Sequence, residues 1–375
     1  MLRCYRVAVL PGDGVGREVV PEAVKVLESA VGIVGGFKLD YVDIPCGGAY
    51  YLETGREWPE DAFDTCKEAD AILFGAVGWP KAVLPDGQLA GIRILLDLRF
   101  GLDLYANVRP ARLYKGVEPL SPGKDKVDFV IVRENTEDLY APIRGVLDRG
   151  NVKEAAVDVR ILTRRGCERV IDYAFKLCLS RGGAPADGKH RVTCIDKSNV
   201  LDGCRFFRGV FDEVAARYPA VERDYVYVDA MTQWMIRAPE HYDVMVTTNM
   251  FGDILSDLSS VLIGGMGMAP SGNIGDRHAM FEPVHGTAPD IAGKNIANPI
   301  GSILSAKMML EWLAQRHNDN SCRKAAQIIE WGVAEVLAEG KIRTPDLCHG
   351  KYANVKPSRT SEVGDAIIQK IEKQK

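Results

Sequence analysis

The sequence lacks the features that mark several large classes of protein. Charged residues interrupt every apolar stretch well before the ~20 residues that a membrane-spanning helix needs. The formal net charge is only -4, so no excess of positive charge favours nucleic acid or an anionic membrane surface. Charged and glycine residues follow closely on the first apolar residues, so we expect no signal peptide. We therefore expect neither nucleic acid nor a membrane as a partner.

Cysteine pairs are absent as well. The nine cysteines are scattered, their number is odd, and none of them forms a C-x-x-C motif. A disulfide framework normally uses an even number of closely spaced cysteines. We therefore expect reduced thiols in the cytoplasm, each most simply a small buried apolar residue.

The first glycine-rich loop lacks one glycine of the dinucleotide-binding fingerprint. Residues 5–10 have the pattern of a buried strand, and residues 11–16 form a loop that leads into a helix with an apolar stripe. A G-x-G-x-x-G motif that starts at Gly12 requires glycine at position 17, where Arg17 stands. We therefore predict that this chain does not have a Rossmann fold of the ordinary kind.

Length and periodicity predict an α/β protein with two lobes. A chain of 375 residues exceeds the size at which a single hydrophobic core keeps growing. Short β-branched strand patterns alternate with helical periodicities along the chain, as in α/β proteins with parallel strands. Residues 156–162 instead alternate between apolar and polar residues, which indicates an antiparallel strand in a mixed sheet or a protruding arm.

One stretch, residues 244–257, combines a strand, a loop and a helix with two aspartates. Residues 244–248 are apolar and β-branched enough for a buried strand. The expected apolar face of the helix consists of Ile254, Leu255, Leu258, Val261 and Leu262. Asp253 and Asp257 are four residues apart and share a helix face, where a divalent cation would offset their repulsion. Alternatively, they are two solvated aspartates near the start of a helix, where negative charge is favoured.

Residues suited to binding an acid and to moving protons follow the other predicted strands. The guanidinium groups, which can hold carboxylates in bidentate fashion, are those of Arg99, Arg109 and Arg133. Lys197 and Tyr140 are candidates for proton transfer, and Asp229 is a further oxygen ligand. Singly, each residue has an ordinary explanation as a surface ion pair or a solvated turn. Together they predict a site for a small polycarboxylic acid with a divalent metal.

Seven sequence runs, in order along the chain, resemble one known family. They are GAVGWP, YANVRP, RENTEDLY, DKSNV, VDAM, NMFGDILSD and EPVHGTAPDIAGKNIANP. They are similar to those of the metal-dependent β-decarboxylating dehydrogenases, which act on isopropylmalate, isocitrate, homoisocitrate and tartrate or D-malate. The resemblance implies a two-lobed isopropylmalate/isocitrate dehydrogenase-like fold with a mixed sheet. Residues 1–104 and 265–375 would form the cofactor-binding domain, and residues 105–264 the dimerisation and substrate/metal domain with its protruding arm.

The resemblance implies an oxidative decarboxylation in a homodimer with shared active sites. A 2-hydroxy acid with a carboxylate on C3 would transfer a hydride to a nicotinamide, lose CO₂ and be protonated as an enolate. Asp253 and Asp257 would hold Mg²⁺ or Mn²⁺ together with Asp229 of the second subunit, and K⁺ is a further cation that the family allows. Lys197, also from the second subunit, would be the base, Tyr140 the acid, and the three arginines would bind the carboxylates.

The resemblance places the cofactor on a loop near the carboxy terminus. The residues implied are Asn199, on the nicotinamide side, and His285, Gly286, Thr287, Ala288, Asp290, Ile291 and Asn298. Asp290 matches an acid that hydrogen-bonds the adenosine ribose, and its charge would repel a 2′-phosphate. NADP-using relatives carry Lys and Tyr in this region, where Asp290 and Ile291 stand here. We therefore predict NAD.

The helix before Arg99 predicts the substrate. Isocitrate-type enzymes carry Ser and Asn in this helix, and homoisocitrate-type enzymes carry an extra Arg. This chain instead has Leu95 and Leu96, and we expect Val200 to face them. An apolar wall disfavours a charged γ-group by desolvation. The best prediction is 3-isopropylmalate or another 3-alkylmalate. Tartrate or D-malate is the alternative, because those enzymes also have two leucines here and share the residues around Trp79; isocitrate and homoisocitrate are less favoured.

Two positions depart from the family pattern. Ile92 stands where isopropylmalate enzymes have Glu, and Asp138 replaces the glycine common in the run RENTEG. Asp138 belongs to the run RENTEDLY, and Ile92 lies in the helix that contains Leu95 and Leu96. The resemblance therefore does not define the shape of the pocket.

Overall fold

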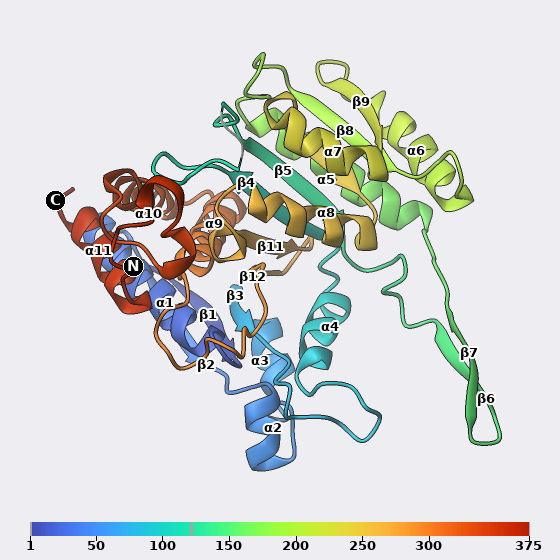
Figure 1. Ribbon diagram of the computed structural model, residues 1–375, viewed down its shortest axis with the longest axis horizontal. Helices are drawn as coiled ribbons and strands as arrows, with labels where there is room; N and C mark the ends of the chain where they lie inside the picture. Colours follow the sequence, from blue (N-terminus) through green and yellow to red (C-terminus); the bar gives the residue numbers. More distant parts are fainter. Residues whose placement is uncertain (1, 121–122, 375) are drawn as a thin grey trace. The chain divides into compact units, whose positions relative to one another are not determined.

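The computed structural model describes residues 2–120 and 123–374. The chain divides into two compact units. The terminal unit consists of Met1–Leu104, Arg112–Asp125 and Ser260–Lys375, and the central unit consists of Tyr105–Ala111 and Lys126–Ser259. Helices and strands alternate in both units, which confirms the predicted α/β class (Figure 1). In the described part of the chain, no helix is both long enough and apolar enough to cross a membrane.

The sheet of the terminal unit is mixed. Its strands follow the order β2-β1-β3-β12-β11. Their bounds are Arg3–Gly12 for β1, Phe37–Asp43 for β2, Ala71–Ala76 for β3, Pro270–Ile274 for β11 and Ala279–Pro283 for β12. Strand β1 is parallel to both β2 and β3, and β12 is parallel to β3 but antiparallel to β11. Strands β3, β11 and β12 are buried along their whole length. In β3 a continuous apolar run favours this burial.

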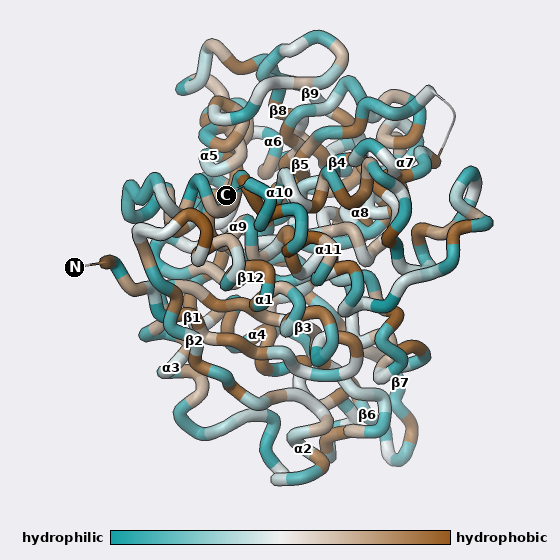
Figure 2. Tube along the Cα trace, turned by 90° about the vertical axis from the view of Figure 1, so that its left-hand side faces the viewer, coloured by the Kyte–Doolittle hydropathy of each residue, from teal (hydrophilic) through white to brown (hydrophobic). Residues whose placement is uncertain are grey.

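Seven helices accompany the sheet in the described part of this unit. They are α1 (Gly16–Val34), α2 (Gly48–Thr54), α3 (Ala62–Glu68), α4 (Ile92–Gly101), α9 (Ile300–His317), α10 (Asn320–Glu339) and α11 (Thr360–Glu372). The periodicity of α1 buries the stripe that contains Val19, Ala23 and Leu27. Apolar colouring of the chain around β1 and α1 in Figure 2 marks part of this core. Short 3₁₀ turns lie at Met266–Met268, Pro345–Leu347 and Gly350–Tyr352.

The sheet of the central unit brings several loop residues to one edge. Its strand order is β4-β5-β10-β8-β9. The bounds are Ala106–Arg112 for β4, Asp128–Glu134 for β5, Arg191–Asp196 for β8, Glu222–Tyr227 for β9 and Val244–Thr247 for β10, which confirms the predicted strand at 244–248. Strand β10 is parallel to β5 and β8, and β8 is parallel to β9. Because parallel strands end at the same edge, the residues that follow β5, β8, β9 and β10 share that edge.

The central unit also contains α5 (Arg164–Ser180), α6 (Asp202–Ala215), α7 (Val228–Arg237), a 3₁₀ turn (Pro239–His241) and α8 (Asn249–Val261). Helix α5 begins at an N-cap, Thr163, whose side-chain oxygen accepts a hydrogen bond from the backbone N–H of Gly166. In α8 the expected apolar face is only partly correct. Leu255 is fully buried, whereas Ile254 is 57% exposed and Val261 is 48% exposed. Periodicity identified the apolar positions but not which of them the chain itself covers.

An antiparallel hairpin stands apart from the other elements of the central unit (Figure 1). It consists of β6 (Arg144–Arg149) and β7 (Val152–Asp158), and every residue of both strands is exposed. The predicted strand range of 156–162 was wrong, because the strand begins and ends four residues earlier. The alternation of apolar and polar residues continues past Asp158, so periodicity alone did not mark the end of the hairpin.

Candidate active site

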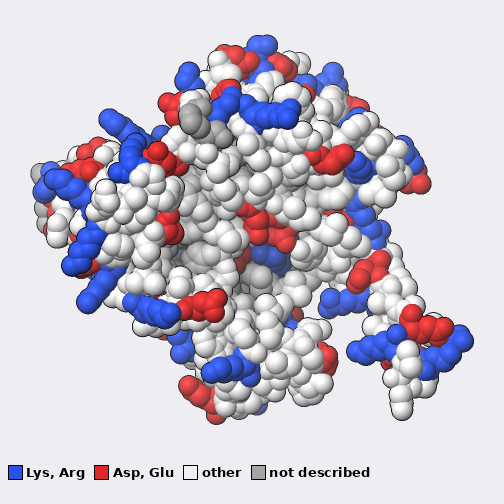
Figure 3. Space-filling view, viewed as in Figure 1, with Lys and Arg blue, Asp and Glu red and all other residues white. Residues whose placement is uncertain are grey.

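Two aspartates of α8 face two arginines of the central sheet. Arg109 on β4 places Nη1 3.4 Å from Asp253 Oδ1 and 3.5 Å from Asp257 Oδ1. Arg133 on β5 donates its Nη1 hydrogen to the same oxygen of Asp253. The pKa of Asp257 is raised above its ordinary value, mainly because the carboxylate is partly buried. Arg109 lowers this pKa in part, and the negative charge of Asp253 raises it further. The guanidinium groups thus partly offset the repulsion between the two carboxylates, which could together hold a cation. Figure 3 shows acidic side chains exposed over α8 beside basic ones.

Tyr140 belongs to the same cluster. Its hydroxyl donates to Asp253 Oδ2, and the guanidinium carbon of Arg133 lies 5.1 Å from the centre of its ring. Asp253 therefore receives hydrogen bonds from three residues of different elements: Arg109, Arg133 and Tyr140. This convergence places a phenolic hydroxyl and two cations around one carboxylate, which is a suitable arrangement for a substrate with several carboxylates.

Both arginines are buried and held by neutral side chains. Arg109 donates from Nε to Asn107 Oδ1 at 2.6 Å and from Nη1 to Ser256 Oγ at 2.7 Å. Arg133 donates from Nε to Asn249 Oδ1 at 2.9 Å. Sequence reasoning missed these three partners, although each lies inside a run that carried the resemblance. Their effect is to fix the guanidinium planes before any ligand binds.

Asp138 connects the Tyr140 loop to the start of α8. It is fully buried, and its φ angle is 66°, a conformation that favours glycine. One carboxylate oxygen accepts a hydrogen bond from Arg160 Nε, and the other accepts from the backbone N–H of Met250 at 3.1 Å. The carboxylate therefore satisfies a free N–H group in the first turn of α8, where negative charge is stabilised.

Lys197 and Asp229 form a separate pair within the chain. Lys197 follows β8 and places its ammonium 2.6 Å from Asp229, which lies in the first turn of α7. The hydrogen bond from Lys197 lowers the pKa of Asp229. Among residues 2–120 and 123–374, the three predicted metal ligands do not form a group whose ligand atoms all lie within 4.8 Å. One chain therefore brings Asp253 and Asp257 together but does not add Asp229 to them. Asn199 and Val200, next to Lys197, are exposed.

The terminal unit holds the remaining predicted substrate residues. Arg99 lies near the end of α4, is 6% exposed and donates to Glu282 Oε1 at 3.0 Å. Its Nε is buried without a hydrogen-bond partner among the described residues. Leu95 and Leu96 are half-buried one turn earlier on the same helix, and Leu95 packs against a buried apolar cluster. Helix α4 thus carries an apolar surface and a buried guanidinium group with a free donor.

The predicted cofactor loop borders a pocket of about 570 Å³ in the terminal unit. Of the predicted residues, it is lined by His285, Gly286, Ala288, Ile291 and Asn298. Thr287 is buried beside it and donates from Oγ1 to the carbonyl of Gly78 at 3.3 Å, and Asp290 is exposed next to Ile291. Burial lowers the pKa of His285, whose Nε2 is buried without a partner in the described part of the chain. Val15, Ile296 and Ala297 add apolar surface, which suits an adenine ring.

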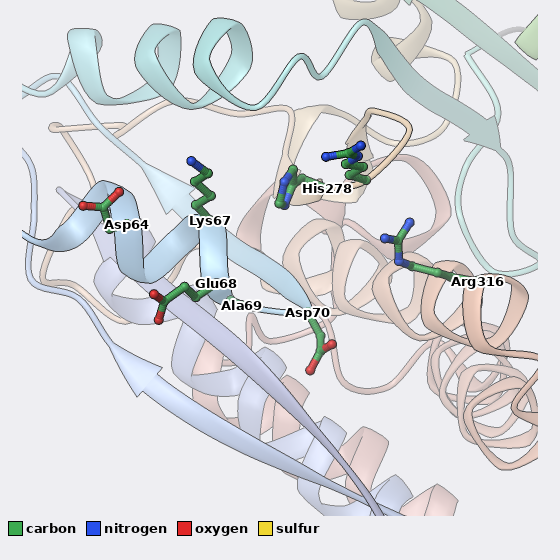
Figure 4. A pocket seen from close by; sticks show the side chains of 8 residues that line it. Asp64, Lys67, Glu68, Ala69, Asp70, His278 and Arg316 are labelled. Atoms are coloured by element: carbon green, nitrogen blue, oxygen red, sulfur yellow. The ribbon is translucent and has the colours of Figure 1, made fainter.

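A second pocket of the terminal unit, of about 530 Å³, lies among residues of α3, the β11–β12 turn and the end of α9 (Figure 4). Its charged lining residues are Asp64, Lys67, Glu68, Asp70, Arg277 and Arg316, together with His278. Acidic and basic side chains are mixed around it, so its lining does not favour a ligand of one charge.

Comparisons with known proteins show the family of this chain. Residues 6–367 match the family model described as isocitrate/isopropylmalate dehydrogenase. The chain is 43% identical to the 3-isopropylmalate/3-methylmalate dehydrogenase of Methanocaldococcus jannaschii, over 92% of this chain and 94% of that protein. It is 38% identical to the 3-isopropylmalate dehydrogenase of Aquifex aeolicus, over 100% of this chain and 99% of that protein.

Solved structures give the same result. The isocitrate dehydrogenase of Methylococcus capsulatus superposes with a TM-score of 0.85 at 37% identity, covering 98% of this chain and 99% of that chain. A β-decarboxylating dehydrogenase of Thermococcus kodakarensis superposes with a TM-score of 0.75 at 37% identity, covering 98% and 96%. Sequence, fold and site geometry together establish that the chain belongs to the isocitrate/isopropylmalate dehydrogenase family.

Proposed function

We propose that this protein catalyses the oxidative decarboxylation of 3-isopropylmalate or another 3-alkylmalate, with NAD and either Mg²⁺ or Mn²⁺. The observation that carries the proposal is the convergence of Tyr140, Arg109 and Arg133 on Asp253. The relatives from Methanocaldococcus jannaschii and Aquifex aeolicus, at 43% and 38% identity, are named for isopropylmalate, which supports an alkyl-substituted substrate.

The residues present fit a hard divalent cation. Asp253 and Asp257 offer carboxylate oxygens, the donors that Mg²⁺ and Mn²⁺ prefer, and their side chains are 33% and 49% exposed, which leaves them accessible to an ion. Arg109 and Arg133, which contact these carboxylates, would then bind the substrate's carboxylates instead. When bound, the cation would polarise the C2 hydroxyl and stabilise negative charge on its oxygen, while NAD accepts the hydride.

The side chains of the protein would do the remaining work. Lys197 is an ammonium in its pair with Asp229, so it would first release a proton to solvent. The neutral amine Nζ would then accept the proton of the C2 hydroxyl as the hydride leaves C2. After CO₂ has left, Tyr140 would donate its phenolic proton to C3 of the enolate. Arg99, with its free buried Nε, would bind a carboxylate, and Leu95 and Leu96 would contact the C3 substituent. Asn199 would contact the nicotinamide side of the cofactor.

We propose further that the active unit is a homodimer in which Lys197 and Asp229 serve the site of the other chain. Lys197 pairs with Asp229, and among the described residues of one chain Asp229 does not form a group of ligand atoms with Asp253 and Asp257, which supports this arrangement. So does the exposed apolar surface of the central unit, because protein interfaces have apolar cores. On the hairpin, this surface includes Val146, Leu147, Val152 and Val157, and on α7 and α8 it includes Trp234, Ile254 and Val261.

We also propose a cytoplasmic location. All nine cysteines are free thiols, and seven of them are buried. Free thiols persist in a reducing compartment and are oxidised or paired in secreted proteins. Mass spectrometry of alkylated protein from intact cells would detect nine reduced thiols if this is correct, and disulfide-linked peptides if it is not.

A substrate panel tests the proposed reaction. NADH formation would be measured with Mn²⁺ and each of 3-isopropylmalate, D-malate, tartrate, isocitrate and homoisocitrate. We expect the highest kcat/KM with 3-isopropylmalate, and we expect Leu95→Ser to lower that value about 10- to 100-fold because it removes apolar contact with the substituent. Leu52→Ser, a change at an exposed leucine of the same unit, is the control. A preference for D-malate or tartrate would instead support the alternative substrate class.

Cofactor selectivity gives a separate expected result. Asp290→Ser should raise kcat/KM with NADP at least about tenfold, and it should lower kcat/KM with NAD, because the change removes both the repulsion of a 2′-phosphate and a ribose hydrogen bond. Initial rates with each cofactor would measure the ratio. Asp64→Ser, which removes an exposed charge elsewhere in the unit, should leave the ratio unchanged. An unchanged ratio in Asp290→Ser would mean that other residues select the cofactor.

A further inference from the structure

Three potential metal ligands lie together in the central unit, away from the dehydrogenase residues. Cys178 is buried on α5, His190 immediately precedes β8, and Asp243 immediately precedes β10. Their sulfur, imidazole nitrogen and carboxylate oxygen atoms all lie within 4.8 Å of one another, and no other such group occurs among residues 2–120 and 123–374. Lys197 follows the opposite end of β8, about 20 Å away at the usual rise per strand residue.

The distances suit a tetrahedral ion. Cys178 Sγ donates to Asp243 Oδ2 at 3.2 Å, and His190 Nδ1 lies 4.0 Å from the same oxygen. With bond lengths of about 2.3 Å to sulfur and about 2.0 Å to nitrogen or oxygen, tetrahedral zinc holds its ligand atoms about 3.3–3.5 Å apart. The observed sulfur-to-oxygen distance is about 0.3 Å shorter than tetrahedral zinc requires, and the nitrogen-to-oxygen distance is about 0.7 Å longer. A small rotation of the partly exposed His190 ring would complete the geometry.

Two features of the neighbouring atoms point to a ligand. His190 Nδ1 is buried and has no hydrogen-bond partner among the described residues, which is unfavourable unless a further group binds it. Arg181 Nε donates to Asp243 Oδ1 at 2.7 Å and so fixes the carboxylate with Oδ2 directed at Cys178. Ligating carboxylates commonly have such an outer hydrogen bond. The positive charge of Arg181 opposes the binding of a cation. Arg181 Nη2 also donates to Asp128 Oδ1 at 2.8 Å, and this second carboxylate partly neutralises the charge.

We propose that Cys178, His190 and Asp243 bind a transition-metal cation such as Zn²⁺, independently of the Mg²⁺ or Mn²⁺ of the dehydrogenase. Sulfur and nitrogen ligands favour Zn²⁺, whereas Mg²⁺ prefers oxygen alone. Binding converts the Cys178 thiol to a thiolate and releases one proton to solvent, so that thiolate and carboxylate balance the ion's two charges. A tetrahedral ion would need one further ligand, such as a water molecule. The ion would join α5 to the starts of β8 and β10.

Cobalt spectroscopy tests this site directly. Co²⁺ would be titrated into metal-free protein that contains excess Mg²⁺, so that the carboxylate site is already filled. We expect thiolate-to-cobalt charge-transfer absorption in the near ultraviolet, which oxygen ligands cannot produce, saturating at one equivalent per chain and lost on addition of Zn²⁺. Cys178→Ala should abolish the absorption. His190→Asn, at a partly exposed residue, should weaken Co²⁺ binding at least about tenfold.

Cys167→Ala is the matched control, because Cys167 is equally buried on the same helix and lies outside the group. It should leave the absorption unchanged. Zn²⁺ should also raise the melting temperature of the parent protein but not that of His190→Asn. Absence of the absorption in the parent, or its persistence in Cys178→Ala, would overturn the proposal. Circular dichroism of each variant would verify that it is folded.

Discussion

Co-expression of two inactive variants of this protein is expected to restore part of its dehydrogenase activity. Lys197→Met removes the proposed base, and Asp253→Asn removes the carboxylate on which Arg109, Arg133 and Tyr140 converge. Each change alone should lower kcat/KM by about 10³-fold, since positioned proton-transfer and electrostatic groups each contribute effects of that order. Co-expression of the two variants should recover about a quarter of the parent activity, because half of the dimers are mixed and each mixed dimer has one intact site.

The expectation follows from how the side chains group within one chain. Lys197 pairs with Asp229, whereas Asp253 lies with Tyr140. If Lys197 serves the partner's site, a mixed dimer unites an unaltered Lys197 from one chain with an unaltered Asp253 from the other. NADH formation with 3-isopropylmalate would measure the recovery.

A second pair of variants is the control. Tyr140→Phe and Asp253→Asn alter the same cluster within a chain, so their mixed dimers should contain no intact site and remain inactive. If neither pair recovers activity although mixed dimers form, each site is built from a single chain and the shared-site proposal is wrong. If both pairs recover, Tyr140 and Asp253 act in different sites, which contradicts the cluster observed.

Removing the carboxylate of Asp138 is expected to reduce both stability and turnover. Asp138 is fully buried and bonds to Arg160 and to the backbone of Met250, so its loss leaves a largely buried guanidinium group without its partner. Such a loss costs about 3 kcal/mol of the free energy of unfolding. Turnover should fall about 10- to 100-fold, because Tyr140, two residues later, loses its fixed position. Urea denaturation and steady-state kinetics would measure the two effects.

Glycine and alanine separate the contributions of backbone and side chain at this position. At a φ of 66°, Asp138→Ala removes only the carboxylate and keeps a strained residue, whereas Asp138→Gly also removes Cβ and relieves the strain. Asp138→Ala should therefore be less stable than Asp138→Gly by about 1 kcal/mol. Asn318→Gly, at a left-handed residue that caps α9, is the control and should be neutral or slightly stabilising. If Asp138→Gly behaves like Asn318→Gly, the carboxylate does not hold the Tyr140 loop.

The sequence correctly predicted those parts of the fold and the site that depend on the residue pattern within one stretch of the chain. The strand at 244–247 and the positions of Asp253 and Asp257 on the helix that follows it are encoded by periodicity within one stretch. The resemblance predicted that Arg109, Arg133 and Tyr140 lie in one site. In the structure all three donate hydrogen bonds to Asp253. For Arg133 and Asp253 the parallel strands β5 and β10 explain this success, because their carboxyl ends share one edge.

Features that depend on contacts between distant segments were not predictable. Asn107, Asn249 and Ser256 have no distinguishing pattern, and their role appears only when they are seen to hold the arginines. Asp138 stood out as a departure from a family glycine, but its φ angle and its bond to Arg160 were needed to explain it. Periodicity likewise cannot tell that Ile254 and Val261 remain exposed in a single chain.

The division of the chain into units has a consequence for its synthesis on the ribosome. The central unit is complete once Ser259 has emerged, whereas strand β3 of the terminal unit must wait for its neighbour β12, which begins at Ala279. At about 5–20 residues per second, the edge of β3 stays unpaired for about 10–40 s after it is made. The amino-terminal strands, although made first, would therefore finish folding last. Until β12 has emerged, this edge of β3 is open to pairing with other chains, so this segment of the nascent chain is a site of aggregation.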